Sequence, residues 1–336
     1  MKVLMISGDP NILDSNSAFS KRVEEYKNIF GELEILICYG NILNFSSGFW
    51  RGFKLLRRNK FDVITAQSPE HWVLGWIFSR FFKIPWQMQI HTDIFSPYFV
   101  KSSVFNKIRV LIAKFLIPRV DGIRVVSERI KNSILEKYEK IVILPIFVDT
   151  EKIKNSPIKT NLHQKYPEKF IILMASRLTK EKNIGSVLET LSSLIRANKR
   201  IVLLIVGNGP EEQKLKCMVN DLDLVNNVVF EPWTNDLTSY YKTCDLFLLT
   251  SNYEGYGMTL IEAASVGAKI ISSNVGIASE ILEKENIFQV GDKNDLIQKL
   301  NLAIAGKIKP AKQLPTQTKE EYLRLYKESL EKCIKK

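Results

Sequence analysis

The sequence has few of the residues that most often hold metals and disulfides. Its 336 residues include only four cysteines and three histidines. Cys38, Cys217, Cys244 and Cys333 are widely spaced and form no CxxC pair. This spacing argues against a zinc cluster and against the disulfide framework of a small secreted protein. We therefore expect reduced thiols in a cytoplasmic protein.

Long apolar runs are also missing. The most apolar stretch, residues 72–90, is interrupted by Arg80, Lys83 and Pro85, so no run approaches the roughly 18 residues of a membrane-spanning helix. The N-terminus starts basic and then apolar, as a signal peptide does, but residues 8–10 end the run too early. We expect a protein that does not cross a membrane.

Positive charge is in excess, yet no arginine-rich tract accompanies it. Lys and Arg number 48 against 36 Asp and Glu, a net charge of +12. Such a balance indicates an anionic partner: nucleic acid, an anionic membrane surface or a phosphorylated small molecule. A nucleic-acid-binding protein stays an alternative from another class, but the sequence has no recognisable nucleic-acid-reading motif, and we expect no nucleic acid partner.

Short apolar runs alternate with segments of helical spacing along the chain. This alternation predicts parallel sheets covered by helices on both faces. The predicted strands are 3–7, 33–38, 62–66, 86–90, 122–126 and 141–144, then 170–175, 201–206, 228–230, 246–250 and 269–272. The predicted helices are 18–30, 49–59, 71–82, 104–116 and 128–138, then 183–197, 210–222, 236–242, 260–266, 292–305 and 319–335.

Length and alternation together predict two Rossmann-like α/β domains. We place them at residues 1–152 and 153–317, with a last helix in 318–336 that packs back on the first domain. The polar stretch 150–169 is interpreted as a hinge region and a loop. In such folds ligands bind at the carboxyl ends of the strands, and the cleft between domains is the usual pocket.

Two motifs of the second half follow strand ends directly. Arg177 and Lys182 lie between a predicted strand and a predicted helix. A guanidinium and an ammonium beside a helix N-terminus can clamp a diphosphate, although a solvated basic loop is the simpler interpretation. Gly207 and Gly209 permit a tight strand-to-helix turn, which is also compatible with a purely structural role.

The most informative motif follows the strand 246–250. Gly257 lets the backbone approach a ligand, and the amides of Met258 and Thr259 open a helix, which makes an anion site of backbone. Glu254 in the loop and Glu262 in the helix would line the same pocket and accept hydrogen bonds from sugar or ribose hydroxyls. Taken alone, Glu262 would be interpreted as a helix-surface glutamate.

These motifs, in this order and at this spacing, resemble glycosyltransferase family 4, the glycosyl transferases group 1. The resemblance covers nearly the whole chain and is most specific in residues 170–291. It implies the GT-B fold, with two facing Rossmann-like doubly wound domains and an interdomain cleft. The first domain would bind the acceptor and the second the nucleotide-sugar donor. A retaining enzyme that needs no metal and no cofactor is implied as well.

The resemblance also implies a role for each of these residues. Arg177 and Lys182 would hold the donor diphosphate, Glu254 the hydroxyls of the donor sugar, and Glu262 the ribose. The remaining donor-binding positions are Gly207, Gly209, Gly257, Met258 and Thr259. Trp233, after the strand 228–230, becomes a candidate contact to the base, unless it is a packing aromatic at a turn.

In the first half the resemblance singles out His91, at the end of the strand 86–90. The corresponding family histidine faces the donor sugar across the cleft. His91 is the one histidine that we place at a site-forming position, in contrast to His71 and His163, although a lone histidine is usually structural. Together with Arg177, Lys182 and Glu254 it forms the predicted catalytic set.

The chain departs from the family pattern in two places. The first loop begins at Gly8, which we include among the donor-binding residues, but Ser17 and Ala18 stand where the family often has a Gly-Gly pair. Of the family's Asn-Gly-Val-Asp only Val148 and Asp149 remain. Acceptor-side geometry and the turn between the domains are therefore expected to differ.

The expected reaction is transfer of a sugar from a nucleotide-diphosphate sugar to a glycan or lipid-linked acceptor of the cell envelope. UDP is favoured as the nucleotide, with GDP as the alternative. The family implies front-face substitution, in which the leaving diphosphate accepts the acceptor's proton and fixed cations stabilise it. A nonhydrolysing sugar-nucleotide epimerase, a glycosidase and a non-catalytic sugar-nucleotide sensor are the alternatives.

Aromatic and basic residues are interleaved in the first half. Of the 34 Phe, Trp and Tyr residues, 22 lie within residues 1–149. In 49–60 helical spacing places Phe49, Phe53 and Leu56 on one face and basic residues on the other, and 98–115 is similarly mixed. An amphipathic helix packed on its sheet is the simpler interpretation. The alternative is docking to an anionic membrane surface, which would make the protein peripheral at the inner face of the membrane.

Overall fold

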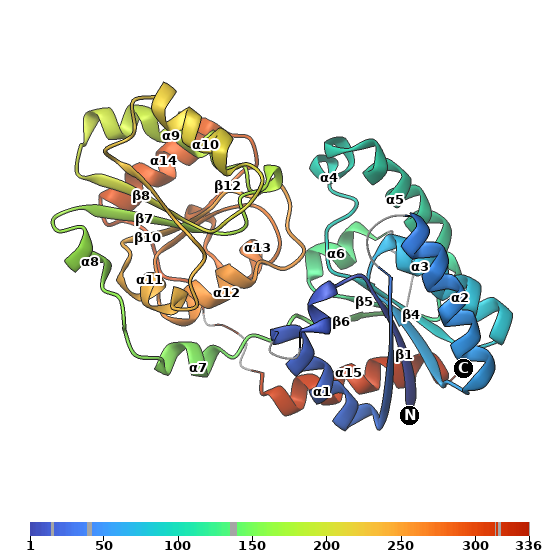
Figure 1. The fold of residues 1–336 in the computed structure, drawn as a ribbon. Coiled ribbons are helices and arrows are strands. Elements are labelled where there is room, and N and C mark those ends of the chain that lie inside the picture. Colours follow the sequence, from blue (N-terminus) through green and yellow to red (C-terminus); the bar gives the residue numbers. More distant parts are fainter. Residues whose placement is uncertain (15–16, 39–41, 135–139, 313, 315–316, 336) are drawn as a thin grey trace. The chain divides into compact units, whose positions relative to one another are not determined.

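The chain divides into two compact units. The computed structural model describes residues 1–14, 17–38, 42–134, 140–312, 314 and 317–335. The first unit contains Met1–Phe147 and Gln317–Lys336, and the second contains Val148–Thr316 (Figure 1). The sequence placed the end of the first domain at residue 152, whereas this division falls after Phe147.

Within its described residues, the first unit is built on a six-stranded sheet. The strand order is β2-β1-β3-β4-β5-β6, and every pairing is parallel. The strands are β1 (Lys2–Ser7), β2 (Glu32–Ile37), β3 (Val63–Ala66), β4 (Trp86–Ile90), β5 (Gly122–Val125) and β6 (Ile141–Ile143). Every residue of β3, β4 and β5 is buried, as expected of a parallel sheet covered on both faces.

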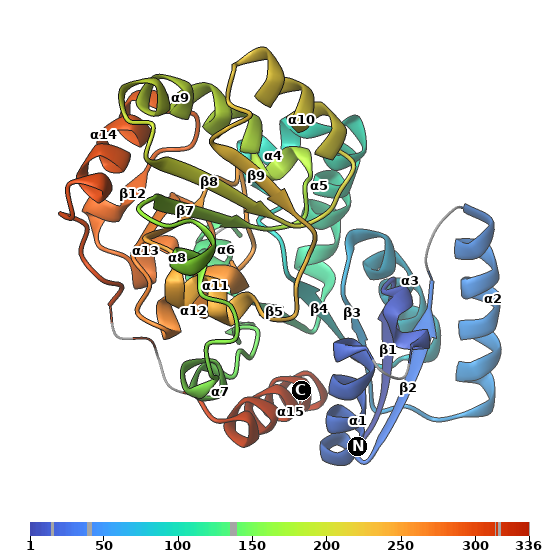
Figure 2. The ribbon, with the colours of Figure 1, turned by 60° about the vertical axis from the view of Figure 1, so that its left-hand side comes forward.

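Helices cover both faces of this sheet. The helices are α1 (Ala18–Phe30), α2 (Ile42–Arg58), α3 (Pro69–Phe82), α4 (Pro97–Ser102), α5 (Val104–Leu116), α6 (Glu128–Ser133) and α15 (Lys319–Ile334), with the 3-10 turns η1 (Pro10–Leu13) and η2 (Ile117–Arg119). In Figure 2, α2 and α3 lie on one face, and α1 and α15 lie on the other. Residues 135–138 of the predicted helix 128–138 lie outside the described residues.

The helix α15 joins the core of the first unit although it is far away in sequence. The ring of Tyr326 packs edge-on against Tyr26 and Phe30, with centroid distances of 5.0 and 5.3 Å. Gln87 on β4 donates from Nε2 to the carbonyl of Ser329 at 3.0 Å. This helix therefore contributes buried aromatic and polar groups beneath the central strands.

The helix α2 begins earlier than the predicted helix 49–59. The structure starts the helix at Ile42, seven residues before the predicted start at Phe49. In the structure the helix continues through Gly48, where an added Cβ would lie 2.2 Å from Sγ of Cys38. Glycine at position 48 lets α2 pack closely against Cys38, which directly follows β2, and it does not interrupt the helix.

The second unit repeats the plan within its described residues. Its sheet has the order β12-β11-β10-β7-β8-β9, again with parallel pairings. The strands are β7 (Phe170–Ala175), β8 (Ile201–Val206), β9 (Val228–Glu231), β10 (Leu246–Leu249), β11 (Ile270–Ser273) and β12 (Ile287–Phe288). The two-residue strand β12 was not predicted, because so short a run has no readable periodicity.

Helices again lie on both faces of the second sheet (Figure 1). They are α7 (Thr150–Asn155), α8 (Leu162–Lys165), α9 (Ile184–Ala197), α10 (Glu212–Asp221), α11 (Leu237–Thr243), α12 (Met258–Ser265), α13 (Ala278–Ile281) and α14 (Lys293–Ile304), with η3 (Lys180–Lys182) and η4 (Lys284–Asn286). The stretch 150–169 was predicted as hinge and loop, and this prediction was incomplete. Asp149 and Asn161 cap α7 and α8 through their side chains, which stabilises even short helices.

Candidate active site

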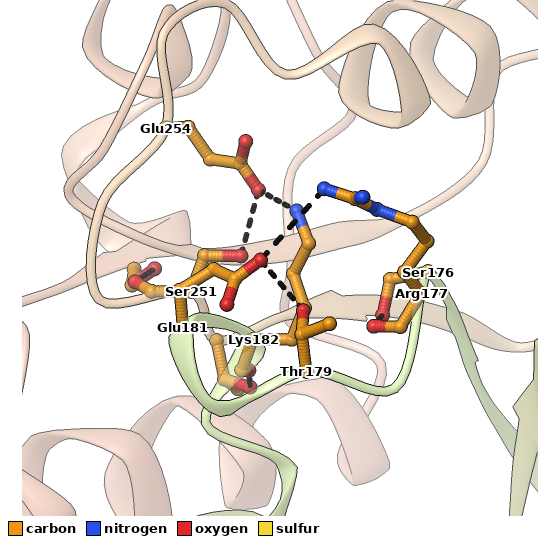
Figure 3. A network of polar contacts seen from close by, with 9 residues as sticks. Ser176, Arg177, Thr179, Glu181, Lys182, Ser251 and Glu254 are labelled. Atoms are coloured by element: carbon orange, nitrogen blue, oxygen red, sulfur yellow. Dashed lines mark hydrogen bonds and ion pairs between the residues drawn. The ribbon is translucent and has the colours of Figure 1, made fainter. Parts of the chain in front are cut away.

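An ion pair between Lys182 and Glu254 lies at the carboxyl end of the second sheet (Figure 3). Nζ of Lys182 is 2.5 Å from Oε1 of Glu254. The same carboxylate oxygen accepts a hydrogen bond from Ser251 Oγ at 2.8 Å, and Thr250 Oγ1 donates to the carbonyl of Lys182 at 2.9 Å. These bonds tie the loop after β7 to the loop after β10. The sequence placed both side chains at a ligand but did not predict that they contact each other.

Arg177 extends from the same loop into solvent. Its side chain is 80% exposed, and Nη2 lies 3.9 Å from Oε1 of Glu181. Glu181 is itself held, since it accepts from Thr179 Oγ1 at 2.6 Å and its carbonyl accepts from the amide of Asn252 at 2.7 Å. An exposed pair at this distance contributes little stability. The guanidinium therefore remains available to an anionic ligand (Figure 3).

The glycines after β8 are required by close backbone contacts. A Cβ at Gly207, whose φ is +145°, would lie 1.9 Å from the carbonyl oxygen of Ser176. A Cβ at Gly209 would lie 2.4 Å from the carbonyl oxygen of Leu178. Both turns thus pack directly on the loop that carries Arg177. In this structure the two glycines shape the cation-bearing loop, and their predicted contact with a donor stays a prediction.

The N-terminus of α12 forms the backbone part of the site. Gly257 precedes it with φ +96°, a conformation that favours glycine. The first amides of a helix have no partner within the helix and attract negative charge. Met258, the first helical residue, is exposed, and Thr259 is half-buried. The anion-binding role of Met258 and Thr259 stays a prediction.

Glu262 lies one turn further along α12 and is partly buried. Its Oε2 accepts a hydrogen bond from the hydroxyl of Tyr241 at 3.1 Å. Burial raises the pKa of Glu262, and the hydrogen bond from Tyr241 only partly opposes this. A carboxylate held away from solvent in this way is suited to accept hydrogen bonds from ligand hydroxyls. The interpretation as a helix-surface glutamate is therefore wrong.

Trp233 lies just beyond the end of β9. Its side chain is half-exposed, and its backbone amide donates to Oδ1 of Asn208 at 3.0 Å. The turn that contains the tryptophan is thereby fixed to the Gly207–Gly209 turn, while the indole is left uncovered. An exposed ring anchored through its backbone suits stacking on a planar ligand better than core packing.

His91 lies at the carboxyl end of the first sheet, directly after β4. Its Nε2 is 3.1 Å from Oε1 of Gln89. Burial, reinforced by the nearby guanidinium of Arg124, lowers the pKa of His91 to about 3. The imidazole is therefore neutral at physiological pH, so it can accept or donate a hydrogen bond but carries no charge.

A cavity of about 470 Å³ opens beside His91 in the first unit. Gly8, Glu70, His71 and Arg109 are among the residues that line it. A Cβ at Gly8 would lie 2.6 Å from Cε1 of His71, so glycine is needed for this shape. His71 accordingly lines the cavity as well, and the view that only His91 occupies a site-forming position was wrong. Nε2 of His71 is hydrogen-bonded to the carbonyl oxygen of Cys38 at 2.7 Å.

Sequence reasoning missed the charged pair of this cavity. Nε of Arg109 donates to Oε1 of Glu70 at 2.6 Å. Burial alone would raise the pKa of Glu70, but hydrogen bonds from the backbone and from Arg109 outweigh it and lower this pKa. The Glu70 carboxylate is therefore ionised. Glu70 follows the strand end of β3 and could have been noticed there. Arg109 lies within α5, where no sequence pattern separates it from a surface cation.

A second cavity, of about 460 Å³, lies in the second unit between α9, α10 and the start of α14. Thr179 and Asn252 line it, but none of the predicted site residues does. We assign the site to the strand-end loops, because there the cations, the carboxylates and the helix N-terminus converge.

Metal-binding clusters and membrane-spanning helices are both absent from the described residues. Those residues contain no group of three or more His, Cys, Asp and Glu side chains placed to hold a metal ion. In the same part of the chain, no helix is both long and apolar enough to span a membrane.

Comparison with known families identifies the type of protein. Residues 156–321 match the family described as glycosyl transferases group 1, and residues 20–152 match glycosyltransferase family 4. Together the matches span most of the chain. The chain belongs to the group 1/family 4 glycosyltransferases. The family resemblance read from the motifs is thereby confirmed.

Curated relatives are about a quarter identical to this glycosyltransferase over the residues that align. The alpha-monoglucosyldiacylglycerol synthase of Streptococcus pneumoniae is 26% identical over 67% of this chain and 54% of its own. An Escherichia coli enzyme, UDP-Gal:alpha-D-GlcNAc-diphosphoundecaprenol alpha-1,3-galactosyltransferase, is 28% identical over 75% of this chain and 68% of its own. The chain therefore matches about half to two thirds of the length of these relatives.

Solved structures confirm the fold. The Anabaena protein Alr3699/HepE, solved in complex with UDP, superposes with a TM-score of 0.71 at 20% identity, over 91% of this chain and 90% of its own. Sucrose-phosphate synthase of Thermosynechococcus elongatus gives a TM-score of 0.73 at 16% identity, over 99% and 94%. At such identities the likeness supports the two-domain Rossmann-like GT-B fold and nothing finer.

Proposed function

We propose that this protein is a retaining glycosyltransferase that moves a sugar from a nucleotide-diphosphate sugar to a glycan or lipid-linked acceptor. One observation carries the proposal. At the carboxyl end of the second sheet, Lys182 and Arg177 provide cations, α12 provides an N-terminus, and Glu254 and Glu262 provide carboxylates. A diphosphate and the hydroxyls of a sugar and a ribose are complementary to this set.

The donor is best supported as a UDP-sugar. The E. coli relative is named for UDP-Gal, and HepE was solved with UDP and with UDP-glucose. The exposed indole of Trp233 would stack on the base, and Glu262 would bind the ribose. A GDP-sugar is the alternative. Thermal-shift measurements with UDP-, GDP- and ADP-sugars test this directly, because a ligand that binds only the folded state raises Tm.

In the proposed mechanism the leaving diphosphate gains charge while the donor sugar becomes oxocarbenium-like. Lys182, Arg177 and the α12 amides would stabilise that charge, since fixed donors act most strongly where charge develops. With no metal and no cofactor invoked, these groups carry the electrostatic part of catalysis. The diphosphate itself would accept the proton of the acceptor hydroxyl in front-face substitution.

Product analysis separates this proposal from its alternatives. A labelled UDP-sugar should lose its label to an acceptor, and NMR should show the donor's anomeric configuration kept in the product. An epimerase would instead change the sugar without an acceptor. An inverted product would refute the retaining mechanism, and the absence of acceptor-dependent transfer would refute the transferase.

We also propose that the acceptor is lipid-linked and that α5 docks on an anionic membrane surface. The segments 49–60 and 98–115 were both candidates. The apolar side chains exposed on α5 are Val104, Phe105, Ile108, Leu111 and Phe115. On α2, Trp50 is exposed, whereas Phe49 and Phe53 are half-buried and Leu56 is buried. The stripe on α5 is thus the larger apolar surface of the two.

Charge around the α5 stripe favours an anionic bilayer as its partner. Lys101, Lys107, Lys114 and Arg119 are exposed next to it. Each surface cation contributes roughly 1 kcal/mol of attraction to an anionic membrane. Arg109, on the same helix, reaches the cavity beside His91. A lipid-linked acceptor held by α5 would thereby have its head group near that cavity.

Vesicle sedimentation tests the docking surface. Phe105→Ser with Leu111→Ser, which removes side chains that are 74% and 65% exposed, should weaken binding to phosphatidylglycerol vesicles at least ~10-fold, because each large apolar side chain contributes about 1.5 kcal/mol or more when buried. Val225→Ser, which removes an apolar side chain of the second unit that is 59% exposed, is the matched control. Equal binding of both variants would refute the surface.

A further inference from the structure

A buried arginine, with no carboxylate partner among the described residues, lies close to His91 and shares Gln89 with it. Arg124 on β5 is 3% exposed. Its Nη2 donates to the hydroxyl of Tyr322 at 3.1 Å and to the carbonyl of Leu144 at 3.3 Å, and Nη1 donates to Oε1 of Gln89 at 3.2 Å. Within the described chain every one of these partners is neutral. Burying an uncompensated charge is costly, so this one calls for an explanation.

The C-terminal helix α15 supplies the surroundings that make this cation tolerable. The guanidinium lies 4.5 Å from the ring centroid of Tyr326 and 5.7 Å from that of Tyr322. Aromatic faces attract cations, more strongly when water is excluded. The hydroxyl of Tyr322 also bonds that of Tyr26 at 3.1 Å. Arg124 is thus held by α15 on one side and by Gln89 on the other.

The arginine fixes the orientation of the Gln89 amide. A guanidinium has donors only, so the amide atom that faces Arg124 must be the oxygen. The other end agrees, because Nε2 of Gln89 donates to Oγ1 of Thr65 at 2.5 Å and to the hydroxyl of Tyr326 at 2.6 Å. Gln89 is fully buried. If the amide were rotated by a half-turn, its NH2 group would face the donors of Arg124, and that hydrogen bond would be lost.

The orientation of the amide in turn determines the proton on His91. Nε2 of His91 faces Oε1 of Gln89 at 3.1 Å, and an amide oxygen only accepts. The hydrogen must therefore lie on Nε2. In a neutral ring this leaves a lone pair on Nδ1. The positive charge of Arg124 disfavours a second proton there.

We propose that Arg124, anchored by α15, is a positioning residue that fixes His91 as the neutral Nε2–H tautomer. His91 then presents Nδ1 as a hydrogen-bond acceptor, suited to a hydroxyl of a ligand. The relevance to catalysis rests on the proposed function, whereas the tautomer itself does not. The last helix of the chain thereby sets the chemistry of a residue more than two hundred positions earlier.

Other charged and titratable groups also face His91. Burial of the ring is the largest cause of its lowered pKa, and Arg22 on α1 lowers this pKa as Arg124 does. Glu70 and Arg109 share the cavity with His91, but they neutralise each other as an ion pair. The hydroxyls of Tyr26 on α1 and Tyr326 on α15 are neutral, because burial raises the pKa of each.

Long-range ¹⁵N–¹H NMR of the uniformly ¹⁵N-labelled full chain tests the tautomer without any ligand. The three histidines give three ring patterns, and His91→Gln assigns the relevant one. We expect the Nε2–H pattern with no titration between about pH 8 and pH 5, well above the pKa of about 3 and across the ordinary value near 6.5. An Nδ1–H pattern, or an imidazolium near pH 6, would overturn the proposal.

Substitutions test whether Arg124 is the cause. Arg124→Met should free the Gln89 amide and mix the two tautomers, and it should raise the pKa of His91, although burial of the ring still holds that pKa below its ordinary value. Tyr322→Phe, which removes one hydrogen bond of Arg124 but keeps its charge, should retain the tautomer. If Arg124→Met does not fold, Arg124→Gln tests the same point, since a neutral amide can present either its oxygen or its nitrogen to Gln89. An unchanged pattern in the folded arginine variant would refute the role of Arg124.

An activity readout then distinguishes the two proposals. In an active enzyme, Arg124→Met should move the acidic limb of the kcat/KM profile to higher pH than in the unaltered protein, which a purely structural defect would not do. If the protein showed no transferase activity, the NMR result would still stand. If the tautomer were wrong, transfer could still be observed, so each failure is recognisable.

Discussion

Replacing Lys182 is the sharpest test of the proposed site. Lys182 and its partner Glu254 are only 18% and 16% exposed, and their charged atoms are 2.5 Å apart. Lys182→Met removes the ammonium while it keeps much of the apolar stem. Lys180→Met is the matched control, because Lys180 belongs to the same turn η3 and is exposed to solvent.

The expected size of the effect follows from the burial of the ammonium. Two unit charges 4 Å apart interact by about 4 kcal/mol at an effective dielectric constant near 20. Removing one fixed donor that faces a developing charge typically costs about 10²- to 10³-fold in kcat, or roughly 2.7–4 kcal/mol. The two figures agree. Lys180 is more exposed and better screened, so its loss should change kcat less than about threefold.

The assay separates ground-state binding from catalysis. Turnover and the affinity for the intact nucleotide-sugar, measured by calorimetry without an acceptor, are both determined with the donor that the thermal-shift screen identifies. Lys182→Met should lower kcat far more than it weakens binding of the nucleotide-sugar, because charge on the diphosphate increases from the bound donor to the transition state. If Lys182→Met and Lys180→Met showed the same kcat, the diphosphate role of Lys182 would be refuted.

Three further predictions concern the second unit. Burial raises the pKa of Glu262, so its ionised carboxylate destabilises the folded state. Glu262→Gln, which can still accept a hydrogen bond from Tyr241, should therefore raise Tm near pH 8. This gain in Tm should fade towards about pH 4, where the carboxyl is protonated in the unfolded state as well. Gly209→Ala should destabilise the unit by about 3 kcal/mol, a Tm loss of roughly 6–12 °C by calorimetry, because its Cβ would lie 2.4 Å from the carbonyl oxygen of Leu178; an unchanged Tm would contradict that contact. Trp233→Ala should weaken UDP binding by roughly 5- to 100-fold, as lost base stacking of about 1–3 kcal/mol implies, with Tm without ligand unchanged.

Strand positions were predictable because a parallel sheet needs apolar residues on both faces. The strand 201–206 was predicted with the bounds that β8 has, and all six of its residues are buried. Helix α5 likewise matches the prediction 104–116. Boundaries failed where tertiary packing overrides propensity. Gly48 lies inside α2 because the helix needs to approach Cys38, which no local pattern reveals.

The candidate site was predictable as a set of residues but not as a set of contacts. Arg177, Lys182, Glu254 and Glu262 follow strand ends, and parallel strands bring their carboxyl ends to one edge. Which of these side chains bond each other depends on loop conformation. The contact between Lys182 and Glu254 means that the two act as a unit, so the effects of replacing them singly should not add.

One signal for the buried arginine was present in the sequence of β4. The strand reads Trp86, Gln87, Met88, Gln89, Ile90, and an amide at every second position of a central strand is unusual, because that strand is covered on both faces. Alternation predicts that both amides point to the same face, and in the structure both contact α15. The register places Arg124 of β5 directly beside Gln89. Two alternating amides beside a charged residue on the neighbouring strand therefore indicate a buried polar network. The aromatic and polar residues that satisfy it, from Tyr322 to Ser329, could not be assigned from sequence, since nothing local shows that the last helix returns to this sheet.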